Sequence, residues 1–224
     1  MTLRRLYVHG AGRRGDAAWP HVTGAREVDF VSFPNASSIA AQVEKLIALC
    51  GGERMLIFAH SIGAVPVVLA ADRLDIAGLV LVEPALYDLA RGEEAIERHI
   101  AIVTEARSQA DNGDLVAFWA ILRPLMFGGP FEPATWDDER PLAEHWASTN
   151  LPWGHGVRAG MLRGIPTLVA TGGWNAEYER IAARLASDGA THVVLEGFAH
   201  RPQDSPSFGA AVADFKRDLA VSDR

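Results

Sequence analysis

Cysteine is almost missing from this 224-residue sequence, and long apolar runs are missing too. The single cysteine, Cys50, cannot form an internal disulfide, so nothing points to an oxidising compartment. No apolar segment is long enough to span a bilayer, and the apolar run within residues 1–8 is too short for a signal peptide. The sequence therefore predicts a cytoplasmic protein with no membrane partner.

Positive charge is also in short supply. Lys and Arg number 21 against 28 Asp and Glu, which gives a formal net charge of -7 and a pI near 5.6. This balance disfavours nucleic acid as a partner and favours neutral or apolar small-molecule substrates. With 49% hydrophobic and 22% charged residues, the chain can form one domain, or one domain that carries a large insertion.

The patterns of common cofactor sites are absent as well. No group of Cys, His and carboxylate residues has the spacing of metal ligands. The glycines at 10 and 12 follow a predicted strand, but the third glycine of a dinucleotide site is missing, and no P-loop pattern occurs. We therefore expect neither a metal nor an organic cofactor.

What the sequence does contain is a regular alternation of strands and helices. Helices are predicted near 37–50 (with Asn35 or Ser37 as its cap), 62–73, 177–186 and 207–220, and strands near 3–8, 27–33, 54–59, 76–82, 166–170 and 192–195. Several of these strands are apolar throughout, which is typical of a parallel sheet covered on both faces. The alternation predicts an α/β protein, a three-layer α/β/α sandwich around a mainly parallel sheet.

Residues 85–164 interrupt the alternation, because they hold helical stretches near 93–110, 114–127 and 139–149 and no convincing strand. We expect residues 1–84 and 165–224 to form the core domain and 85–164 to form a helical cap over a ligand site. The alternative is that this insert only extends the core. If it is a cap, Trp119, Trp153 and His155 are candidates to line the substrate pocket.

One stretch, residues 55–64, passes abruptly from an apolar strand into a helix around Ser61. Such a turn crowds the backbone, so it needs small side chains two positions to either side, and Ala59 and Gly63 supply them. The turn would raise the Ser61 hydroxyl above the carboxyl end of the sheet. A pentapeptide of this kind is common by chance, so it needs support from the rest of the chain.

A serine nucleophile requires a base, and His200 is the strongest candidate. It lies on a loop of glycine and small residues that follows the last predicted strand. In a parallel sheet that loop and Ser61 lie at the same edge. His60, beside the serine, is expected to pack rather than to catalyse.

These features together resemble the α/β-hydrolase fold. The residues that carry the resemblance are His9 to Gly12, the turn at 59–63, the helical insert after the next strand, and the segment 197–200. The resemblance implies six parallel strands in the order 2-1-3-4-5-6, with a shortened N-terminus that lacks two leading strands. It also implies an oxyanion hole formed by two backbone N–H groups, that of Ile62 and that of Ala11.

The third member of a catalytic triad is where the sequence departs from this family. The family's usual loop aspartate has Asn175 in its expected place. Glu83 ends the buried strand 76–82, and some members of the family take their acid from that strand. Because a buried carboxylate needs a partner, Glu83 is the first choice, and Asn175 or Glu177 is the second. The alternative is that Glu83 only faces solvent or pairs with an arginine.

The sequence therefore predicts a serine hydrolase that cleaves a carboxylic ester or related small acyl compound through Ser61, His200 and Glu83. Two alternatives stay open because a fold does not dictate chemistry. One is a non-hydrolytic lyase with the same residues. The other is a ligand-binding pseudoenzyme. The sequence leaves the substrate and the oligomeric state undetermined.

Overall fold

The computed structural model describes residues 3–22, 28–34 and 37–222. The chain divides into two compact units, Met1–Ala90 with Leu151–Arg224, and Arg91–Asn150. We call them the sheet unit and the helical unit. The predicted insert of residues 85–164 thus contains the helical unit, while its two ends, 85–90 and 151–164, belong to the sheet unit.

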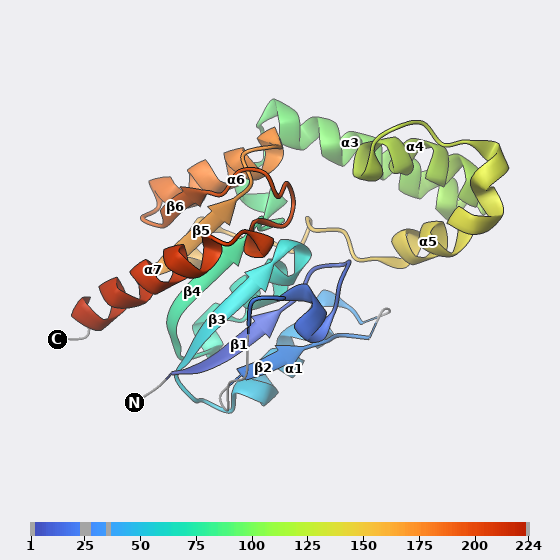
Figure 1. Ribbon diagram of the computed structural model, residues 1–224. Helices are drawn as coiled ribbons and strands as arrows, with labels where there is room; N and C mark the ends of the chain where they lie inside the picture. The colour runs from blue at the N-terminus through green and yellow to red at the C-terminus, as the bar shows by residue number, and fades with distance from the viewer. Residues whose placement is uncertain (1–2, 23–27, 35–36, 223–224) are drawn as a thin grey trace. The chain divides into compact units, whose positions relative to one another are not determined.

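The sheet unit is built on six strands in the order β2-β1-β3-β4-β5-β6, and every neighbouring pair is parallel (Figure 1). The strands are β1 (Arg4–Val8), β2 (Val28–Val31), β3 (Met55–His60), β4 (Ile76–Val82), β5 (Thr167–Thr171) and β6 (Thr191–Val194). This confirms the predicted class, strand number and order. Glu27, the predicted start of the second strand, lies outside the described residues.

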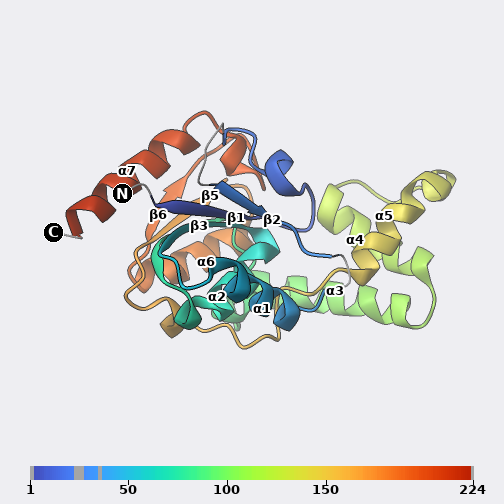
Figure 2. The same ribbon diagram turned by 90° about the horizontal axis from the view of Figure 1, so that it is seen from below.

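Helices cover both faces of the sheet. Figure 2 shows α1 (Ile39–Cys50), α2 (Ala64–Leu69) and α6 (Ala176–Ser187) on one face and α7 (Phe208–Ser222) on the other. The three-layer prediction is therefore confirmed. The cap of α1 is Ser38, whose hydroxyl accepts the Ala41 N–H, rather than the predicted Ser37. The other predicted cap, Asn35, lies outside the described residues.

The strands are apolar throughout because both faces are buried. Alternate side chains point to opposite faces of a sheet, so Leu56 and Phe58 of β3 share one face. There they join a buried cluster with Phe215 and Leu219 of α7. Ile57, between them, is equally buried on the opposite side of β3. Packing in this core thus fixes the positions of the strand ends, next to which the candidate site residues lie.

The helical unit contains α3 (Glu94–Asp111), α4 (Leu115–Phe127) and α5 (Trp136–Ser148), as the sequence predicted. Its own core includes Phe118, Trp119 and Ala143. Arg107 of α3 donates hydrogen bonds to two backbone carbonyls at the end of α5. The role of this unit as a cap stays a prediction. Within the described parts of both units, no helix is long and apolar enough to cross a membrane.

Candidate active site

The candidate residues of the sheet unit follow the carboxyl ends of its strands. His9 follows β1, Ser61 follows β3, Glu83 follows β4, and His200 lies on the loop after β6. Parallel strands place all these ends at one edge of the sheet. The strand order reverses between β1 and β3, where ligands bind in open α/β sheets.

Ser61 occupies a strained turn. Its φ is 54°, a left-handed conformation that residues with a Cβ adopt infrequently. β3 ends at His60, a 3₁₀ turn covers Ser61–Gly63, and α2 begins at Ala64. The sharp strand-to-helix turn predicted around Ser61 is therefore present. Strain of this kind persists only where the surrounding structure enforces it, and it is frequent at functional sites.

Two glycines allow the loop after β1 to pack against this turn. A Cβ on Gly10 would lie 2.9 Å from the Cβ of Ser61, and a Cβ on Gly63 would overlap the carbonyl oxygen of His9. His9 itself is buried, and its Nδ1 donates to the carbonyl of Gly10 at 2.5 Å. The loop therefore passes directly beside the serine, where an oxyanion hole would be needed. The assignment of its donors to Ala11 and Ile62 stays a prediction.

The serine and the predicted base are within hydrogen-bond distance. Ser61 Oγ lies 3.0 Å from Nε2 of His200. The His200 side chain is 34% exposed, so a reactant can approach it. The loop that carries it turns sharply at Gly197 and Ala199, which have φ values of 91° and 45°. This pair has the geometry in which a histidine can accept a serine proton.

Glu83 lies on the far side of the His200 ring. Its side chain is fully buried, and its φ is 43°. One carboxylate oxygen accepts the Gly172 N–H at 2.6 Å, and the other accepts the Trp174 Nε1–H at 3.2 Å. The second oxygen also lies 3.4 Å from Nδ1 of His200, close enough for an ion pair. Among the described residues, Nδ1 has no partner with hydrogen-bond geometry. In enzymes, contacts of this kind often tighten only when substrate binds.

The second-choice residues, Asn175 and Glu177, make other contacts. The side-chain oxygen of Asn175 accepts the Glu177 N–H at 2.7 Å and caps α6. The Glu177 carboxylate accepts a hydrogen bond from the Tyr87 hydroxyl at 2.6 Å. The geometry around His200 thus favours Glu83 as the group that orients the imidazole.

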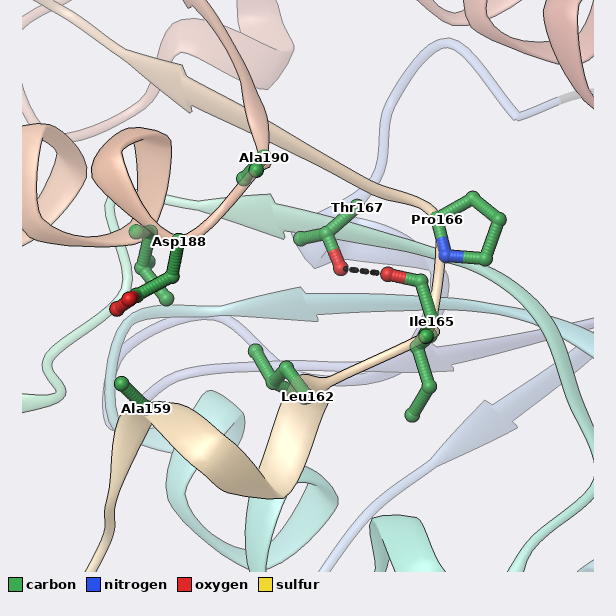
Figure 3. A pocket seen from close by; sticks show the side chains of 10 residues that line it. Ala159, Leu162, Ile165, Pro166, Thr167, Asp188 and Ala190 are labelled. Atoms are coloured by element: carbon green, nitrogen blue, oxygen red, sulfur yellow. Dashed lines mark hydrogen bonds between the residues drawn. The ribbon is translucent and has the colours of Figure 1, made fainter.

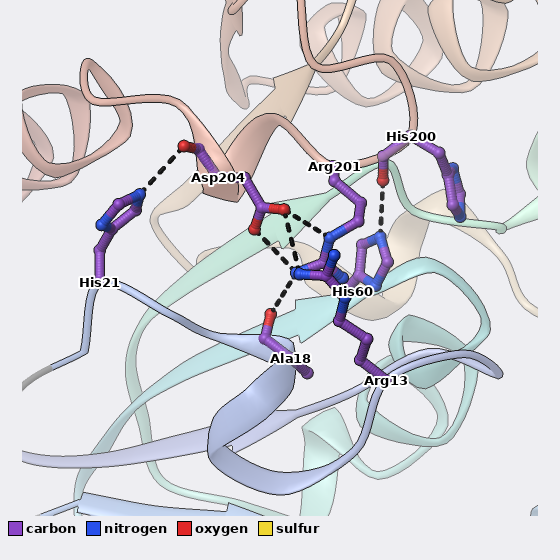
Figure 4. Close-up of polar contacts among 7 residues, drawn as sticks. All are labelled: Arg13, Ala18, His21, His60, His200, Arg201 and Asp204. Carbon is purple, nitrogen blue, oxygen red and sulfur yellow. Dashed lines mark hydrogen bonds and ion pairs between the residues drawn. The ribbon is translucent and has the colours of Figure 1, made fainter.

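His60 supports the loop that carries His200. It is buried, and its Nε2 donates a hydrogen bond of 2.8 Å to the backbone carbonyl of His200 (Figure 4). Burial, followed by the nearby His200 and Arg201, lowers the pKa of His60 well below its usual value. The ring therefore stays neutral at pH 7 and acts as a fixed donor, in agreement with its predicted packing role.

A second set of hydrogen bonds holds the segment that follows His200. Arg201 makes two hydrogen bonds of 2.7 Å to the carboxylate of Asp204, and one of 3.0 Å to the carbonyl of Ala18 (Figure 4). His21 Nε2 lies 3.0 Å from the carbonyl of Asp204. These contacts tie the loop after β6 to the segment after β1. Both loops that border Ser61 are thus held by the same network.

The three residues proposed to line a pocket have structural contacts of their own. Trp119 is 1% exposed in the core of the helical unit, and its Nε1 donates to Glu139. Trp153 packs on Tyr87, with ring centroids 5.6 Å apart. His155 Nε2 donates to the carbonyl of Leu151 at 2.8 Å. A role for them in substrate binding stays a prediction.

Two residues beside His200 were not predicted from the sequence. The Tyr178 ring lies 4.9 Å from the His200 ring, and the Trp174 ring lies 6.2 Å from it. Both residues follow β5, at the same sheet edge as Glu83. Their position after β5 is the only feature of the sequence that could have indicated a place in the site, since aromatic residues at the start of a helix usually serve packing.

One cavity lies at the opposite edge of the sheet. It has a volume of about 230 Å³ and is bordered by Leu162, Pro166, Asp188 and Ala190, beside the starts of β5 and β6 (Figure 3). None of the predicted site residues lines it. Across the described residues, no group of three or more His, Cys, Asp or Glu side chains is arranged to hold a metal ion.

Comparisons with known proteins add structural neighbours. No protein-family model and no curated protein sequence matches the chain. A hydrolase from Oleispira antarctica matches with a TM-score of 0.64 at 13% identity, over 96% of this chain and 92% of that chain. NosK from Streptomyces actuosus matches at 0.61 and 19%, over 98% and 100%. A carboxylesterase from the thaumarchaeon Nitrososphaera gargenis matches at 0.60 and 13%, over 99% and 92%. At these identities the likeness shows a shared fold.

Proposed function

We propose that this chain, which has the α/β-hydrolase fold, is a serine hydrolase that cleaves a carboxylic ester or a related small acyl compound. The observation that carries the proposal is the contact of 3.0 Å between Ser61 Oγ and His200 Nε2, at a strained turn on the carboxyl edge of the sheet. Glu83, 3.4 Å behind His200, completes the arrangement of nucleophile, base and acid.

In the first half of the reaction, Ser61 Oγ attacks the substrate's carbonyl carbon while its proton moves to Nε2 of His200. The carbonyl oxygen becomes an oxyanion, for which the backbone N–H groups of Ala11 and Ile62 are the proposed donors. When the carbonyl re-forms, the bond to the leaving group breaks and His200 protonates that group. Glu83 holds the ring and stabilises its positive charge. The product is an acyl-enzyme on Ser61.

In the second half, water takes the place of the leaving group. His200 accepts a proton from the water, whose oxygen attacks the acyl carbon. The second tetrahedral intermediate collapses, Ser61 Oγ leaves with the proton from His200, and the carboxylic acid is released. Every proton moves through Nε2 of His200, which explains why one histidine beside the serine suffices. No cofactor takes part in these steps.

A fluorophosphonate probe followed by peptide mass spectrometry tests the nucleophile. We expect the probe to modify Ser61 in the wild type and in His145→Ala, a matched histidine change in the helical unit. We expect labelling to be lost in His200→Ala, because an unassisted serine hydroxyl reacts poorly at neutral pH. Unchanged labelling of His200→Ala would contradict the assigned base.

The two alternative functions give different results with a short-chain aryl ester. A hydrolase releases the alcohol and accumulates mass on Ser61 when the reaction is quenched early. A lyase with the same residues would be labelled by the probe but would form no acyl-enzyme. A binding protein that is folded but has no activated serine would give neither signal.

A further inference from the structure

The two oxygens of the Glu83 carboxylate have different partners. Oε1 accepts the Gly172 N–H at 2.6 Å. Oε2 accepts the Nε1–H of Trp174 at 3.2 Å and lies 3.4 Å from Nδ1 of His200. The tryptophan and the proposed base therefore face the same oxygen atom. The mechanism above assigns the tryptophan no role.

Trp174 is not held in place by burial. It is 50% exposed, whereas Trp19 and Trp119 are 2% and 1% exposed. Half of this large side chain faces solvent, while its N–H reaches a carboxylate that has no exposure at all. Its ring also meets the His200 ring edge-on, with centroids 6.2 Å apart. The indole thus borders the proposed acid and the proposed base together.

Two glycines precede Trp174 and allow the tight turn that directs its indole inward. Gly173 has a φ of 69°, a left-handed conformation that glycine adopts without strain. A Cβ on Gly172 would overlap the carbonyl oxygen of Ala199 and lie 3.0 Å from Cδ1 of the tryptophan. The turn therefore packs directly against the loop after β6. One turn, residues 172–174, thus supplies the donors for both carboxylate oxygens.

A carboxylate oxygen can accept two hydrogen bonds at once. On Oε2 of Glu83, one lone pair accepts the Trp174 N–H, which leaves the other to face Nδ1 of His200. The productive tautomer of His200 carries its proton on Nδ1, because Nε2 must be free to accept the proton of Ser61. Gly172 holds Oε1, and the tryptophan N–H is the hydrogen bond that fixes Oε2.

We propose that Trp174 is a positioning residue of the hydrolase, whose Nε1–H fixes Oε2 of Glu83 beside Nδ1 of His200. The indole gives up no proton. It acts through the carboxylate, which orients the imidazole and stabilises its positive charge. A carboxylate that is already fixed needs no rearrangement when the imidazolium forms. This inference rests on the proposed hydrolase function.

Trp174→Phe removes the N–H and keeps an aromatic ring. We expect the second-order rate of Ser61 labelling by a fluorophosphonate to fall about 10-fold, the lower end of the range for a lost hydrogen bond to a charged group. With a short-chain aryl ester, kcat should fall by a similar factor while KM changes less than about 3-fold. Trp136→Phe, a half-buried tryptophan of the helical unit, is the matched control and should keep the wild-type rates. Urea unfolding checks that each variant is folded.

A double-mutant cycle shows whether the tryptophan acts through Glu83. In a Glu83→Gln background the carboxylate is gone, and the new NH₂ group would face the Trp174 N–H. We therefore expect Trp174→Phe to change the labelling rate less than about 2-fold in that background. Because the probe reacts only once with each molecule, this slow labelling can be followed over hours.

Each outcome has a separate meaning. A wild-type labelling rate in Trp174→Phe would contradict the inference, and a variant that no longer folds would show a structural role instead. An equal fall in both backgrounds would show that the ring acts independently of the acid, which also overturns the inference. So would a loss of kcat/KM that comes entirely from KM, because the ring would then bind substrate. If the wild type itself is not labelled at Ser61, the proposed function fails, and the inference fails with it.

Discussion

Glu83 combines structural contacts with a proposed chemical role. Its carboxylate has no exposure to water and is held by Gly172 N–H and Trp174 Nε1–H. Burying such a group is costly unless it is paired, and His200 Nδ1 supplies the remaining neighbour. The same contacts that make the burial tolerable also place the carboxylate behind the imidazole.

Replacing Glu83 with Gln should therefore reduce turnover strongly. The amide oxygen can still accept the Gly172 N–H, but the NH₂ group would face Trp174 Nε1–H and His200 Nδ1. We expect kcat to fall about 10²- to 10⁴-fold, because the neutral amide can neither stabilise the imidazolium nor hold the productive tautomer. Steady-state kinetics on a short-chain aryl ester measures this.

Asn175→Ala is the comparison variant. It removes the cap of α6, which should cost about 1 kcal/mol of stability, seen in the urea midpoint, and leave kcat within a few-fold of wild type. Near-normal turnover in Glu83→Gln, together with a large loss in Asn175→Ala, would move the acid assignment to the loop after β5.

At the scale of single residues, some members of the candidate site could be predicted from local sequence patterns and others could not. Ser61 and Gly63 carry a local steric pattern, and Glu83 was found because a carboxylate closing an apolar strand needs a partner. Tyr178 carries no such local signal. Its contact with His200 joins α6 to a loop more than twenty residues away, and only the folded sheet brings the two together.

At the scale of elements, the turn from β3 to α2 is tightly constrained by its neighbours. Gly63 has an ordinary helical conformation, with φ at -60°, so conformational freedom is not why it is glycine. The reason is space, because the carbonyl of His9 occupies the volume that a Cβ would need. A small residue is required here by packing between two loops.

Gly63→Ala should therefore destabilise the protein and displace the loop after β1. We expect a loss of about 1–3 kcal/mol in the free energy of unfolding, as for overpacking elsewhere, and a marked fall in Ser61 labelling. Gly209→Ala in α7 is the matched control, since a Cβ there meets no atom and alanine favours a helix. It should leave labelling and stability unchanged or raise stability slightly. Equal effects of the two changes on urea unfolding would contradict the packing explanation.

Elements with a clear period were predicted to within a few residues. The strands and the helices α3, α4, α6 and α7 follow from apolar spacing and end signals. The helix after Ser61 was predicted to reach residue 73, but α2 ends at Leu69 and a separate 3₁₀ turn covers Ala71–Arg73. Burial of nearly all of α2 removes the amphipathic spacing from which its end could be judged.

At the scale of the whole molecule, buried histidines link stability to pH. Burial lowers the pKa of His9 and of His60 below the value that each has in the unfolded chain. Above the unfolded value, near 6.5, both states are neutral and stability is complete. As the pH falls below this value, the two histidines become protonated in the unfolded chain but stay neutral in the folded protein. The free energy of unfolding therefore decreases until the pH reaches the pKa values of the folded state.

Urea unfolding between pH 7.5 and 5.5 tests this dependence. We expect the free energy of unfolding to fall with decreasing pH by up to about 1.4 kcal/mol per pH unit for each of the two histidines. His60→Gln removes one of these groups, so it should be less stable at pH 7.5 but show a shallower slope. A slope identical to that of the wild type would show that His60 does not contribute.

The sequence alone determined the class of sheet, the strand order through the family resemblance, and the residues Ser61, His200 and Glu83 as candidates. The class of sheet and the turn at Ser61 could be predicted because apolar period and turn sterics are local properties, whereas the strand order and the choice of Glu83 also drew on the family resemblance. Only the tertiary structure decided that Asn175 caps a helix, that His60 anchors the His200 loop, and that the Tyr178 ring packs on His200. Those contacts join segments distant in sequence, and their geometry is set by the packing of the sheet and its helices.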